Sequence, residues 1–393
     1  MTSFSVMALS ECCEIISGAT PSTSVEEYWD GEICWATPKD LSDLKNHYIS
    51  NTPRKLSQQG LRSCAASVLP TNSVLFSSRA PIGHVAINTV PMATNQGFKS
   101  FIPQADLLDA KFLFHWLKAN RPYLENLGVG ATFKEVSKAI VAKIQVPVPP
   151  LVEQRRIAAI LDQADALRAK RREALAQLDS LAQSIFIEMF GNQLPTTGAG
   201  TPLSKLVEIN PKITPSEREC LAEKMVTFLP MASISDKEKR VLTVEKRPYR
   251  EVSKGYTPFK VGDVLLAKIT PCYENGKLAI VEGVPTEFGF GSTEFHVFRP
   301  DTAELGLFVF HLLQLDWIAA AGAKAMKGAA GQKRVPADFF GNLTIRPPQA
   351  SQLAIFANRI SVINNLKANC RNALEELDAL FSSLKNRAFR GEL

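Results

Sequence analysis

The sequence lacks any segment that would cross a membrane or direct secretion. None of its apolar runs reaches the roughly 18 uninterrupted residues expected of a membrane-spanning helix. The first residues, MTSFSVMALSECCEII, have neither the basic start nor the long apolar core of a signal peptide. We therefore expect a cytoplasmic protein without a membrane partner.

Regular cysteine spacing is also missing. The chain has seven cysteines, an odd number, and no two of them are spaced as Cys-x-x-Cys. Disulfide frameworks normally have an even count, and zinc sites normally show that short spacing. We expect reduced thiols and no zinc site.

Motifs for catalysis and cofactor binding are absent as well. There is no Asn/Asp-Pro-Pro-aromatic loop of a DNA amino-methyltransferase, and the glycine turns at Gly128 and Gly289 lack the third glycine of a dinucleotide loop. The histidines are isolated from one another and from any nucleophile pattern. We expect buried structural roles for His115 and His311, which fall in apolar helical runs. The chain is therefore predicted to have no catalytic, cofactor-binding or metal-binding residues. The five histidines are His47, His84, His115, His296 and His311.

Acidic residues are missing from two long stretches in which basic residues remain. Leu44 to Ala105 and Trp317 to Ala337 contain no Asp or Glu, although the net charge of the whole chain is only +6. The second stretch places its cations in the run AAAGAKAMKGAAGQKR, whose small residues let a backbone approach a partner closely. Both stretches suit a polyanion, and an ordinary solvated loop is the alternative for each.

What the sequence does contain is a long helix, present twice. Between Leu151 and Phe190 there is no Gly and no Pro, and apolar residues recur every third and fourth position. The same seam returns 199 residues later without a gap, and the match includes Asp179 with Asp378, which two unrelated amphipathic helices would not share. We expect the two helices to pack on each other as a coiled coil. The predicted seam consists of Ile157, Leu161, Leu175, Leu178 and Ile185, and of Phe356, Ile360, Ile363, Leu374, Leu377, Phe381 and Leu384.

The sequence in front of each helix is duplicated too. LSECCEIISGATPS from Leu9 and LSKLVEINPKITPS from Leu203 share Leu, Ser, Glu, Ile, Thr, Pro and Ser at a constant offset, which indicates a tandem duplication. The expected order is a globular domain at residues 1–149, a helix at 150–191, a linker at 192–202, a second domain at 203–347 and a helix at 348–390.

Within each globular part, short strands precede helices. SVLFSSRAPIGHVAI and DVLLAKITPCYENGKLAIV each predict a hairpin, and MATNQGFKSFIP and GFGSTEFHVFRP each predict one further strand. The segments LLDAKFLFHWLKANRPYLENL and AELGLFVFHLLQLDWIAAAG then show helical periodicity. We predict an α+β protein with two globular domains in tandem pseudo-repeat and two long helices.

Several of these segments resemble motifs of the specificity subunits of type I restriction-modification systems. They are KEVSKAIVAKIQVPVPPLVEQRRIAAIL, ATNQGFKSFIP, SSRAPIG, GFGSTEFHVFRP and GAAGQKRVPADFFGNLTIRPP. The resemblance covers nearly the whole chain. The second copy departs from it at the domain-to-helix junction, where Ser351-Gln352 stands in place of Glu153-Gln154.

The resemblance implies that each globular domain is a target-recognition domain that reads one half of a bipartite sequence in double-stranded DNA. It also implies that the two helices pair antiparallel and dock two modification subunits. S-adenosylmethionine, ATP and Mg²⁺ would then act in the modification subunits and in restriction subunits, and this chain would be non-catalytic. A coiled-coil protein-binding adaptor without DNA specificity is the alternative, and a fused nuclease or methyltransferase ranks last.

Some of the basic and polar residues are candidates for DNA contact. Arg79 lies in a turn between two strands, and Lys333 and Arg334 lie in the small-residue loop, so we predict that all three contact DNA. Gln96, Lys99 and Ser292 flank equivalent strands and are candidates for reading bases. The predicted DNA-binding set further includes Arg54, Lys55, Arg62, Lys268, Lys324 and Lys327.

Overall fold

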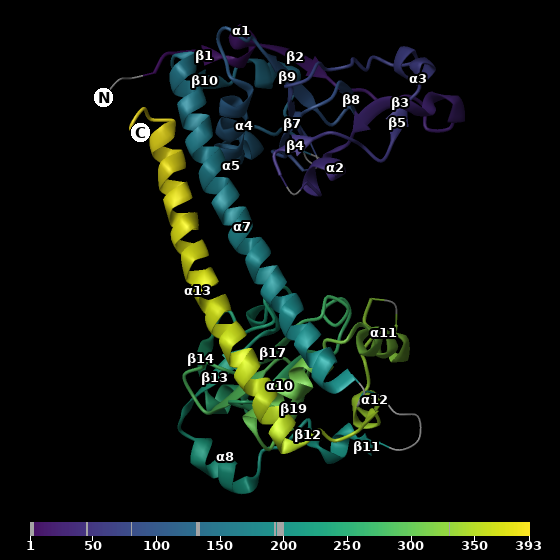
Figure 1. Cartoon of the computed structure of the whole chain (residues 1–393), viewed down its shortest axis with the longest axis vertical. Helices are drawn as coiled ribbons and strands as arrows, with labels where there is room; N and C mark the ends of the chain where they lie inside the picture. Colours follow the sequence, from purple (N-terminus) through teal and green to yellow (C-terminus); the bar gives the residue numbers. More distant parts are fainter. Residues whose placement is uncertain are drawn as a thin grey trace. The chain divides into compact units, whose positions relative to one another are not determined.

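The computed structural model describes residues 4–44, 46–79, 81–130, 134–191, 194, 200–329 and 331–393. It divides the chain into two compact units: unit 1 is Met1–Glu173 with Arg371–Leu393, and unit 2 is Ala174–Cys370. Each unit contains one globular part and a portion of both long helices (Figure 1). The predicted α+β class, with two domains and a helix pair, is confirmed.

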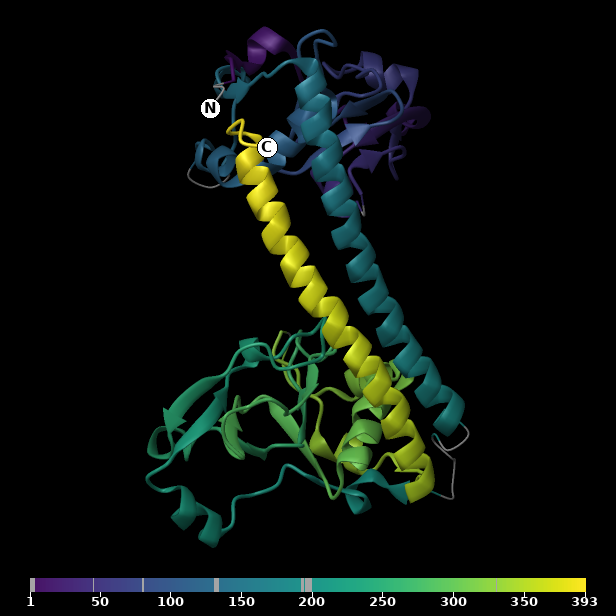
Figure 2. The ribbon, with the colours of Figure 1, turned by 60° about the vertical axis from the view of Figure 1, so that its left-hand side comes forward.

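The two long helices are α7 (Leu151–Phe190) and α13 (Ala350–Ala388), each about 60 Å long at 1.5 Å per residue. In unit 1, Ile157 of α7 shares a buried core with Ala388 near the end of α13. In unit 2, the ring centroids of Phe190 and Phe356 are 5.3 Å apart, so the end of α7 meets the start of α13. The pairing within each unit is therefore antiparallel (Figure 2).

A cation interrupts the seam on each helix, and each one pairs with an aspartate of the opposite helix. In unit 1, Arg168 donates to Asp378 and its guanidinium carbon lies 4.3 Å from the centroid of the Phe381 ring. In unit 2, Lys367 pairs with Asp179 at 2.6 Å. Lys367 follows Arg168 by 199 residues, and Asp378 follows Asp179 by the same number. The same ion pair thus forms in each unit with the roles of the helices reversed, which explains why both copies keep the aspartate.

The predicted seam is fully buried only towards the ends of the helices. Ile157, Leu161, Phe356, Ile360 and Ile363 are at most 4% exposed. The other predicted seam residues are half-buried, and they are Leu175, Leu178, Ile185, Leu374, Leu377, Phe381 and Leu384. The buried positions lie in the cores of the two globular parts. Most of the burial along the seam is therefore supplied by the globular parts rather than by the helix pair alone.

The globular part of unit 1 is built on a five-stranded sheet in the order β2-β9-β6-β7-β4. Its strands are β2 (Cys13–Ser17), β4 (Tyr48–Ile49), β6 (Val74–Phe76), β7 (Val85–Asn88) and β9 (Lys99–Pro103). Leu75 pairs antiparallel with Ala86, which confirms the predicted hairpin. Helix α4 (Ala110–Ala119) covers this sheet, and its Phe112 packs in one core with Phe101. A smaller sheet has the order β5-β3-β8 and consists of β3 (Trp29–Ala36), β5 (Lys55–Leu56) and β8 (Met92–Thr94).

Unit 2 repeats this plan. Its first sheet, β12-β19-β16-β17, has the same order as β2-β9-β6-β7, and its strands are β12 (Val207–Ile209), β16 (Val264–Ala267), β17 (Leu278–Ile280) and β19 (Phe295–Pro300). Its second sheet, β14-β13-β18-β15, consists of β13 (Met225–Leu229), β14 (Glu245–Pro248), β15 (Thr257–Lys260) and β18 (Phe288–Gly291). Strands β13 and β18 run parallel, as β3 and β8 do in unit 1. Helix α10 (Ala303–Leu312) takes the place of α4. The shared strand order supports the duplication inferred from sequence.

A short strand pair joins the beginning and end of each globular part. In unit 1, β1 (Val6–Ala8) pairs with β10 (Gln145–Pro147), and in unit 2, β11 (Thr201–Pro202) pairs with β20 (Thr344–Ile345). The remaining α-helices of unit 1 are α1 (Leu9–Cys12), α2 (Pro38–Ser42), α3 (Gln58–Arg62), α5 (Arg121–Asn126) and α6 (Lys138–Ala142). Those of unit 2 are α8 (Pro215–Leu221), α9 (Tyr249–Val252), α11 (Asp316–Ala325) and α12 (Ala337–Gly341).

Several expectations differ from the structure. MATNQGFKSFIP forms two strands rather than one, β8 and β9, because Asn95 accepts a hydrogen bond from the amide of Gly97 and turns the chain. GFGSTEFHVFRP is divided in the same way into β18 and β19, and Ser292 accepts from the amide of Glu294 between them. In the predicted linker, residues 192–193 and 195–199 lie outside the described residues, and Thr201–Pro202 already form β11.

Two simpler expectations concern the cysteines and the membrane. All seven cysteines are free, as predicted. Among the described residues, no single helix is long and apolar enough to span a membrane; α10 and α11 reach that length and composition only together, with a bend of 71° between them.

Candidate nucleic-acid interface

The smaller sheet of unit 1 carries an exposed arginine held against two tryptophans. The guanidinium carbon of Arg54 lies 3.5 Å from the ring centroid of Trp29 and 5.5 Å from that of Trp35. The two indoles meet edge to face with centroids 5.0 Å apart. Stacking orders the arginine while its outer side stays open to solvent. Lys55, in strand β5 of the same sheet, is half-buried. Arg62, at the end of helix α3, is exposed.

Two residues of unit 1 that we predicted to contact DNA, Lys99 and Arg79, lie beside the carboxylate of Glu135. Lys99 is 8% exposed, and its ammonium lies 3.2 Å from Glu135. Arg79 approaches the other oxygen of Glu135 at 3.8 Å and stays partly exposed. The prediction that Lys99 reads bases is therefore not supported, because its charged end is buried and paired. Gln96 is exposed and hydrogen-bonded to Thr20, a position that still allows contact with a ligand.

The first part of the small-residue run of unit 2 belongs to α11, and the loop proper follows from Met326. The ends of this loop are joined by paired backbone hydrogen bonds between Lys327 and Arg334. Gly328 has a φ of +128°, and a Cβ atom there would lie 2.7 Å from the carbonyl oxygen of Gln332, so a larger residue would not fit. Lys327 and Lys333 are exposed on this loop, whereas Lys324, which the sequence placed in the loop, is exposed on α11. Ala330 lies outside the described residues.

Arg334 has a partner within the protein, although we predicted that it contacts DNA. Its guanidinium donates to both oxygens of Glu294 at 2.8 and 2.9 Å. That pair lowers the pKa of Glu294. Arg334 therefore fixes the loop to the turn between β18 and β19, and Ser292 shapes the same turn through its hydrogen bond to the amide of Glu294.

A basic cleft lies in unit 2, and of the three cations that line it Lys268 was predicted from the sequence whereas Lys212 and Arg218 were not. The cleft has a volume of about 430 Å³, and its lining includes Lys212, Arg218, Lys268, Tyr256 and Phe290. Burial lowers the pKa of Lys268, although Glu294 acts in the opposite direction. Cations beside aromatic rings suit the phosphates and bases of a nucleic acid. Lys212 and Arg218 escaped detection because their surroundings in sequence are acidic, so no run of basic residues marks them.

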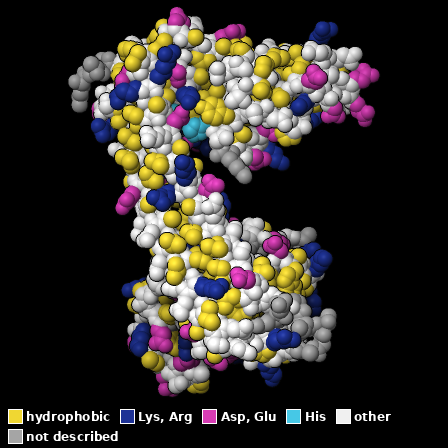
Figure 3. Space-filling view, in the orientation of Figure 1, with side chains coloured by type: hydrophobic (Ala, Val, Ile, Leu, Met, Phe, Trp, Pro, Cys, Tyr) yellow, Lys and Arg dark blue, Asp and Glu magenta, His cyan; other side chains and the backbone are white. Residues whose placement is uncertain are grey.

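Basic and acidic side chains are mixed on the one face of the surface that Figure 3 presents. The candidate contacts with nucleic acid are therefore local groups within each unit: the Arg54 sheet in unit 1, and the small-residue loop and the basic cleft in unit 2.

The junction between the first globular part and α7 depends on a fully buried glutamine. Gln154 is 0% exposed, and its side-chain oxygen accepts from the amide of Asp109 at 2.8 Å. Its side-chain nitrogen donates to the carbonyls of Leu107 and Pro149 at 2.8 and 2.7 Å. Gln352 in the second copy is half-buried and accepts from the nearby amide of Gln349. The sequence departure at the second junction is thus a real structural difference.

The expectation that the histidines are isolated from one another is wrong for one pair. The rings of His47 and His115 have centroids 5.3 Å apart, although 67 residues separate them in sequence. His115 and His311 are buried, as expected from their apolar helices, with exposures of 2% and 5%.

Comparisons with known proteins agree with this architecture. Residues 1–177 match the family model described as "Type I restriction modification DNA specificity domain". The MjaIX specificity subunit of Methanocaldococcus jannaschii is 34% identical over 187 residues, which are 47% of this chain and 43% of that protein. The EcoEI specificity subunit of Escherichia coli is 36% identical over 197 residues, 49% of this chain and 32% of that protein. The aligned part is thus less than half the length of either relative.

Two solved structures share the fold over the whole chain. The S subunit of a type I restriction-modification system from M. genitalium aligns with a TM-score of 0.54 and 13% identity, covering 98% of this chain and 96% of that one. A chain from a type I R-M system, studied for its complex assembly and conformational transition, aligns with a TM-score of 0.56 and 17% identity, covering 100% and 99%.

These likenesses show the fold of the chain and the family that its first 177 residues resemble. The duplicated α+β parts with their antiparallel helices have the fold of an S subunit. Residues 1–177 match the DNA specificity domain of type I restriction-modification systems, and the curated relatives aligned over about half of the chain are type I specificity subunits.

Proposed function

We propose that this chain reads a bipartite sequence in double-stranded DNA, with one half-site bound by each globular part. The observation that carries the proposal is the structural repeat: two domains with the same strand order, each fused to the same antiparallel helix pair. Two similar modules joined by long helices suit two separated half-sites, because each module would have its own base-reading surface. The exposed Arg54, the small-residue loop and the basic cleft supply cations for phosphates.

We further propose that the helix pair docks two copies of a modification subunit. Leu167 and Leu366 are 46% and 48% exposed and lie 199 residues apart, and so do Leu181 and Leu380, at 47% and 50%. Exposed leucines at repeated positions offer the same apolar contact twice. That repetition fits two identical partners better than one.

The chemistry of modification and cleavage is assigned to the partners in this proposal. We place no S-adenosylmethionine, ATP or Mg²⁺ site in the described part of this chain, and its role is non-catalytic. The methyl transfer belongs to the modification subunits, and ATP-driven translocation with cleavage belongs to the restriction subunits.

Methylome sequencing of a host that carries the subunits together tests this function. The expected result is one methylated motif made of two half-sites with a fixed unread gap. Exchanging residues 1–149 for those of another specificity subunit should change one half-site and leave the other intact. A continuous motif, or a motif unaffected by the exchange, would contradict the proposal. Binding to protein partners without any sequence-dependent DNA binding would favour the adaptor instead.

A further inference from the structure

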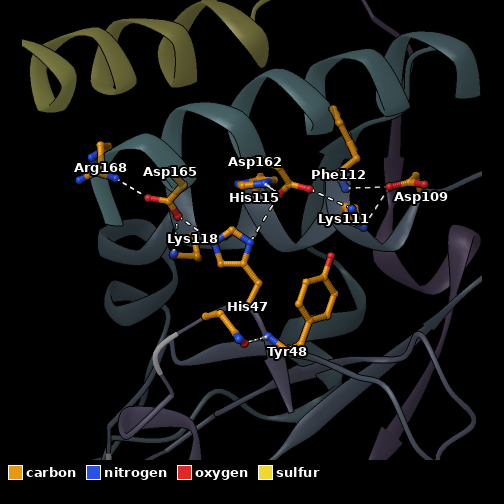
Figure 4. Close-up of polar contacts among 11 residues, drawn as sticks. His47, Tyr48, Asp109, Lys111, Phe112, His115, Lys118, Asp162, Asp165 and Arg168 are labelled. Atoms are coloured by element: carbon orange, nitrogen blue, oxygen red, sulfur yellow. Dashed lines mark hydrogen bonds and ion pairs between the residues drawn. The ribbon is translucent and has the colours of Figure 1, made fainter. Parts of the chain in front are cut away.

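A group of charged side chains joins the first globular part to α7. Its members come from three segments: His47 precedes β4, Lys111, His115 and Lys118 lie on one face of α4, and Asp162 and Asp165 lie on one face of α7 (Figure 4). All of them except the buried His115 border a cleft of about 530 Å³ that also includes Asn46 and Arg172. The three α4 residues are spaced by four and three positions and the two α7 residues by three, so each set lies on a single face of its helix.

His47 lies between two carboxylates. Its Nε2 is 2.8 Å from an oxygen of Asp165, and its Nδ1 is 3.4 Å from an oxygen of Asp162. A neutral imidazole has only one N–H, so it would direct a lone pair at one of these carboxylates. The imidazolium ion donates from both nitrogens. The arrangement therefore suits protonated His47.

The other basic side chains around His47 are each paired with one of the two aspartates. His115 Nε2 lies 2.7 Å from Asp162, Lys111 lies 3.0 Å from the second oxygen of Asp162, and Lys118 lies 3.5 Å from Asp165. Arg168 contacts the other oxygen of Asp165 at 2.6 Å. Phe114 packs on the His47 ring with centroids 4.5 Å apart. Each aspartate thus accepts from several cations and stays ionised.

The two histidines respond to this environment in opposite ways. Burial lowers the pKa of His47, but the hydrogen bonds to Asp162 and Asp165 outweigh it, and the net pKa is raised. Burial dominates for His115, whose pKa is lowered despite its hydrogen bond to Asp162. Burial also raises the pKa of both aspartates, but hydrogen bonds and nearby cations hold each well below its usual range.

A proton suits this place better than a metal ion does. The ligand atoms of His47, His115 and Asp162 lie within 4.8 Å of one another, close enough for a shared cation. However, the ammonium groups of Lys111 and Lys118 already contact both carboxylates, and they would repel a divalent ion. In unit 2 the equivalent of His115 is His311, and the residues 199 positions after Asp162 and Asp165 are the uncharged Ser361 and Asn364. His311 instead lies 3.1 Å from the neutral Gln183. The charged arrangement therefore belongs to unit 1.

We propose that His47 is a proton-dependent positioning residue that holds the first globular part on α7, and that DNA binding by this part weakens when His47 loses its proton. The second half of this statement rests on the proposed function. Since the pKa of His47 in the folded chain is raised, its stabilising contribution is complete below the unfolded-state pKa of about 6.5 and is lost as pH rises through the folded-state pKa.

Ring titration and unfolding of the full-length chain test the first half. His47→Gln identifies the His47 signal in NMR spectra of histidine rings, and we expect that signal to titrate above the other four and to shift downward in Asp165→Asn. The urea midpoint of the unaltered chain should exceed that of His47→Gln at pH 5.5, and the difference should vanish at high pH. His84→Gln is the control, because burial lowers the pKa of His84 and the expected pH trend is the reverse.

Three results would overturn the positioning role. They are a His47 pKa at or below 6.5, a stability difference that does not change with pH, and micromolar Zn²⁺ binding that disappears in His47→Gln. For the second half, affinity for the methylated motif should fall several-fold with rising pH in the unaltered chain and stay level in His47→Gln. Equal pH dependence in both chains would refute the coupling. Absence of sequence-dependent binding at every pH would refute the proposed function instead, while the ring titration would still decide the positioning role.

Discussion

Neighbouring carboxylates decide which basic residues are left available to a phosphate group. Lys333 and Arg334 are adjacent in sequence, yet Lys333 is exposed while Arg334 donates to both oxygens of Glu294. Lys99 and Arg79 share Glu135 in a looser arrangement, with Lys99 at 3.2 Å from one oxygen and Arg79 at 3.8 Å from the other. A bidentate guanidinium–carboxylate pair is geometrically specific and not easily exchanged for a phosphate. The exposed cations are thus better candidates for DNA contact than the paired ones.

Lys333→Ala should flatten the salt dependence of DNA binding. Each phosphate contact adds about 0.9 to the slope of log affinity against log salt, so the slope should fall by about one. Filter binding or fluorescence anisotropy between roughly 50 and 200 mM salt measures this slope. Lys99→Met, which removes a buried and paired charge, should leave the slope unchanged. An unaltered slope in Lys333→Ala would remove the loop from the interface.

Gln154→Ala should destabilise the first junction. The substitution leaves the buried amide of Asp109 and the carbonyls of Leu107 and Pro149 without their side-chain partner, at a cost of about 2–3 kcal/mol. Urea unfolding gives this free energy. Gln352→Ala at the second junction is the matched control and should cost about 1 kcal/mol or less, because that side chain is half-buried. Equal losses at the two junctions would argue against this account.

The features that could be predicted from the sequence depend on a local pattern, and the features that were missed depend on partners that are distant in sequence. The seam at Ile157 and Phe356 follows from periodicity, which is local and repeats along one helix. The partner of Lys99, Glu135, lies 36 residues away, and His47 meets Asp162 and Asp165 on another element. Such pairs depend on the packing of whole elements. The helices, the repeat and the free thiols could therefore be predicted from the sequence alone. Which cations are paired with carboxylates could not.

At the scale of elements, the helix pair is held most firmly where it joins the globular parts. Phe356 is fully buried with Phe186 and Phe190 in the core of unit 2, whereas Leu377 is half-buried. A heptad pattern marks both positions alike, because it records only that a residue faces a partner helix. The difference comes from α10, whose Phe308 covers the same aromatic group.

Phe356→Ala should therefore cost far more stability than Leu377→Ala. Removing a fully buried phenylalanine leaves a cavity and costs about 3–5 kcal/mol, while a half-buried leucine costs about 1 kcal/mol. Urea unfolding followed by circular dichroism of the helices measures both. Comparable losses would show that the middle of the seam is as tightly packed as its ends, contrary to the burial described above.

At the scale of the whole molecule, α7 and α13 each continue from one unit into the other. Matched insertions of seven residues after Arg172 and after Arg371 preserve the heptad and lengthen both helices by about 10 Å. Under the proposed function, the unread gap should grow by roughly three base pairs at 3.4 Å each, with both half-sites unchanged. Sequencing of methylated sites from a library with randomised gaps reports this directly.

An insertion in α7 alone is the control for this prediction. It breaks the match between the helices, so loss of assembly is expected rather than a longer gap. Altered half-site bases at a constant gap would mean that the helices take part in reading the sequence.

Unit 1 is completed by residues that leave the ribosome long after the rest of it. Ala388 fills the core beside Ile157 and Leu161, and the rings of Phe389 and Phe112 have centroids 5.4 Å apart. Roughly 200 residues separate Glu173 from Arg371, and translation at about 5–20 residues per second needs roughly 10–40 s for them. During that interval the nascent first domain exposes the apolar face of α7 that α13 later covers. Unit 2 is continuous in sequence, so the domain that is synthesised first is the last to be finished.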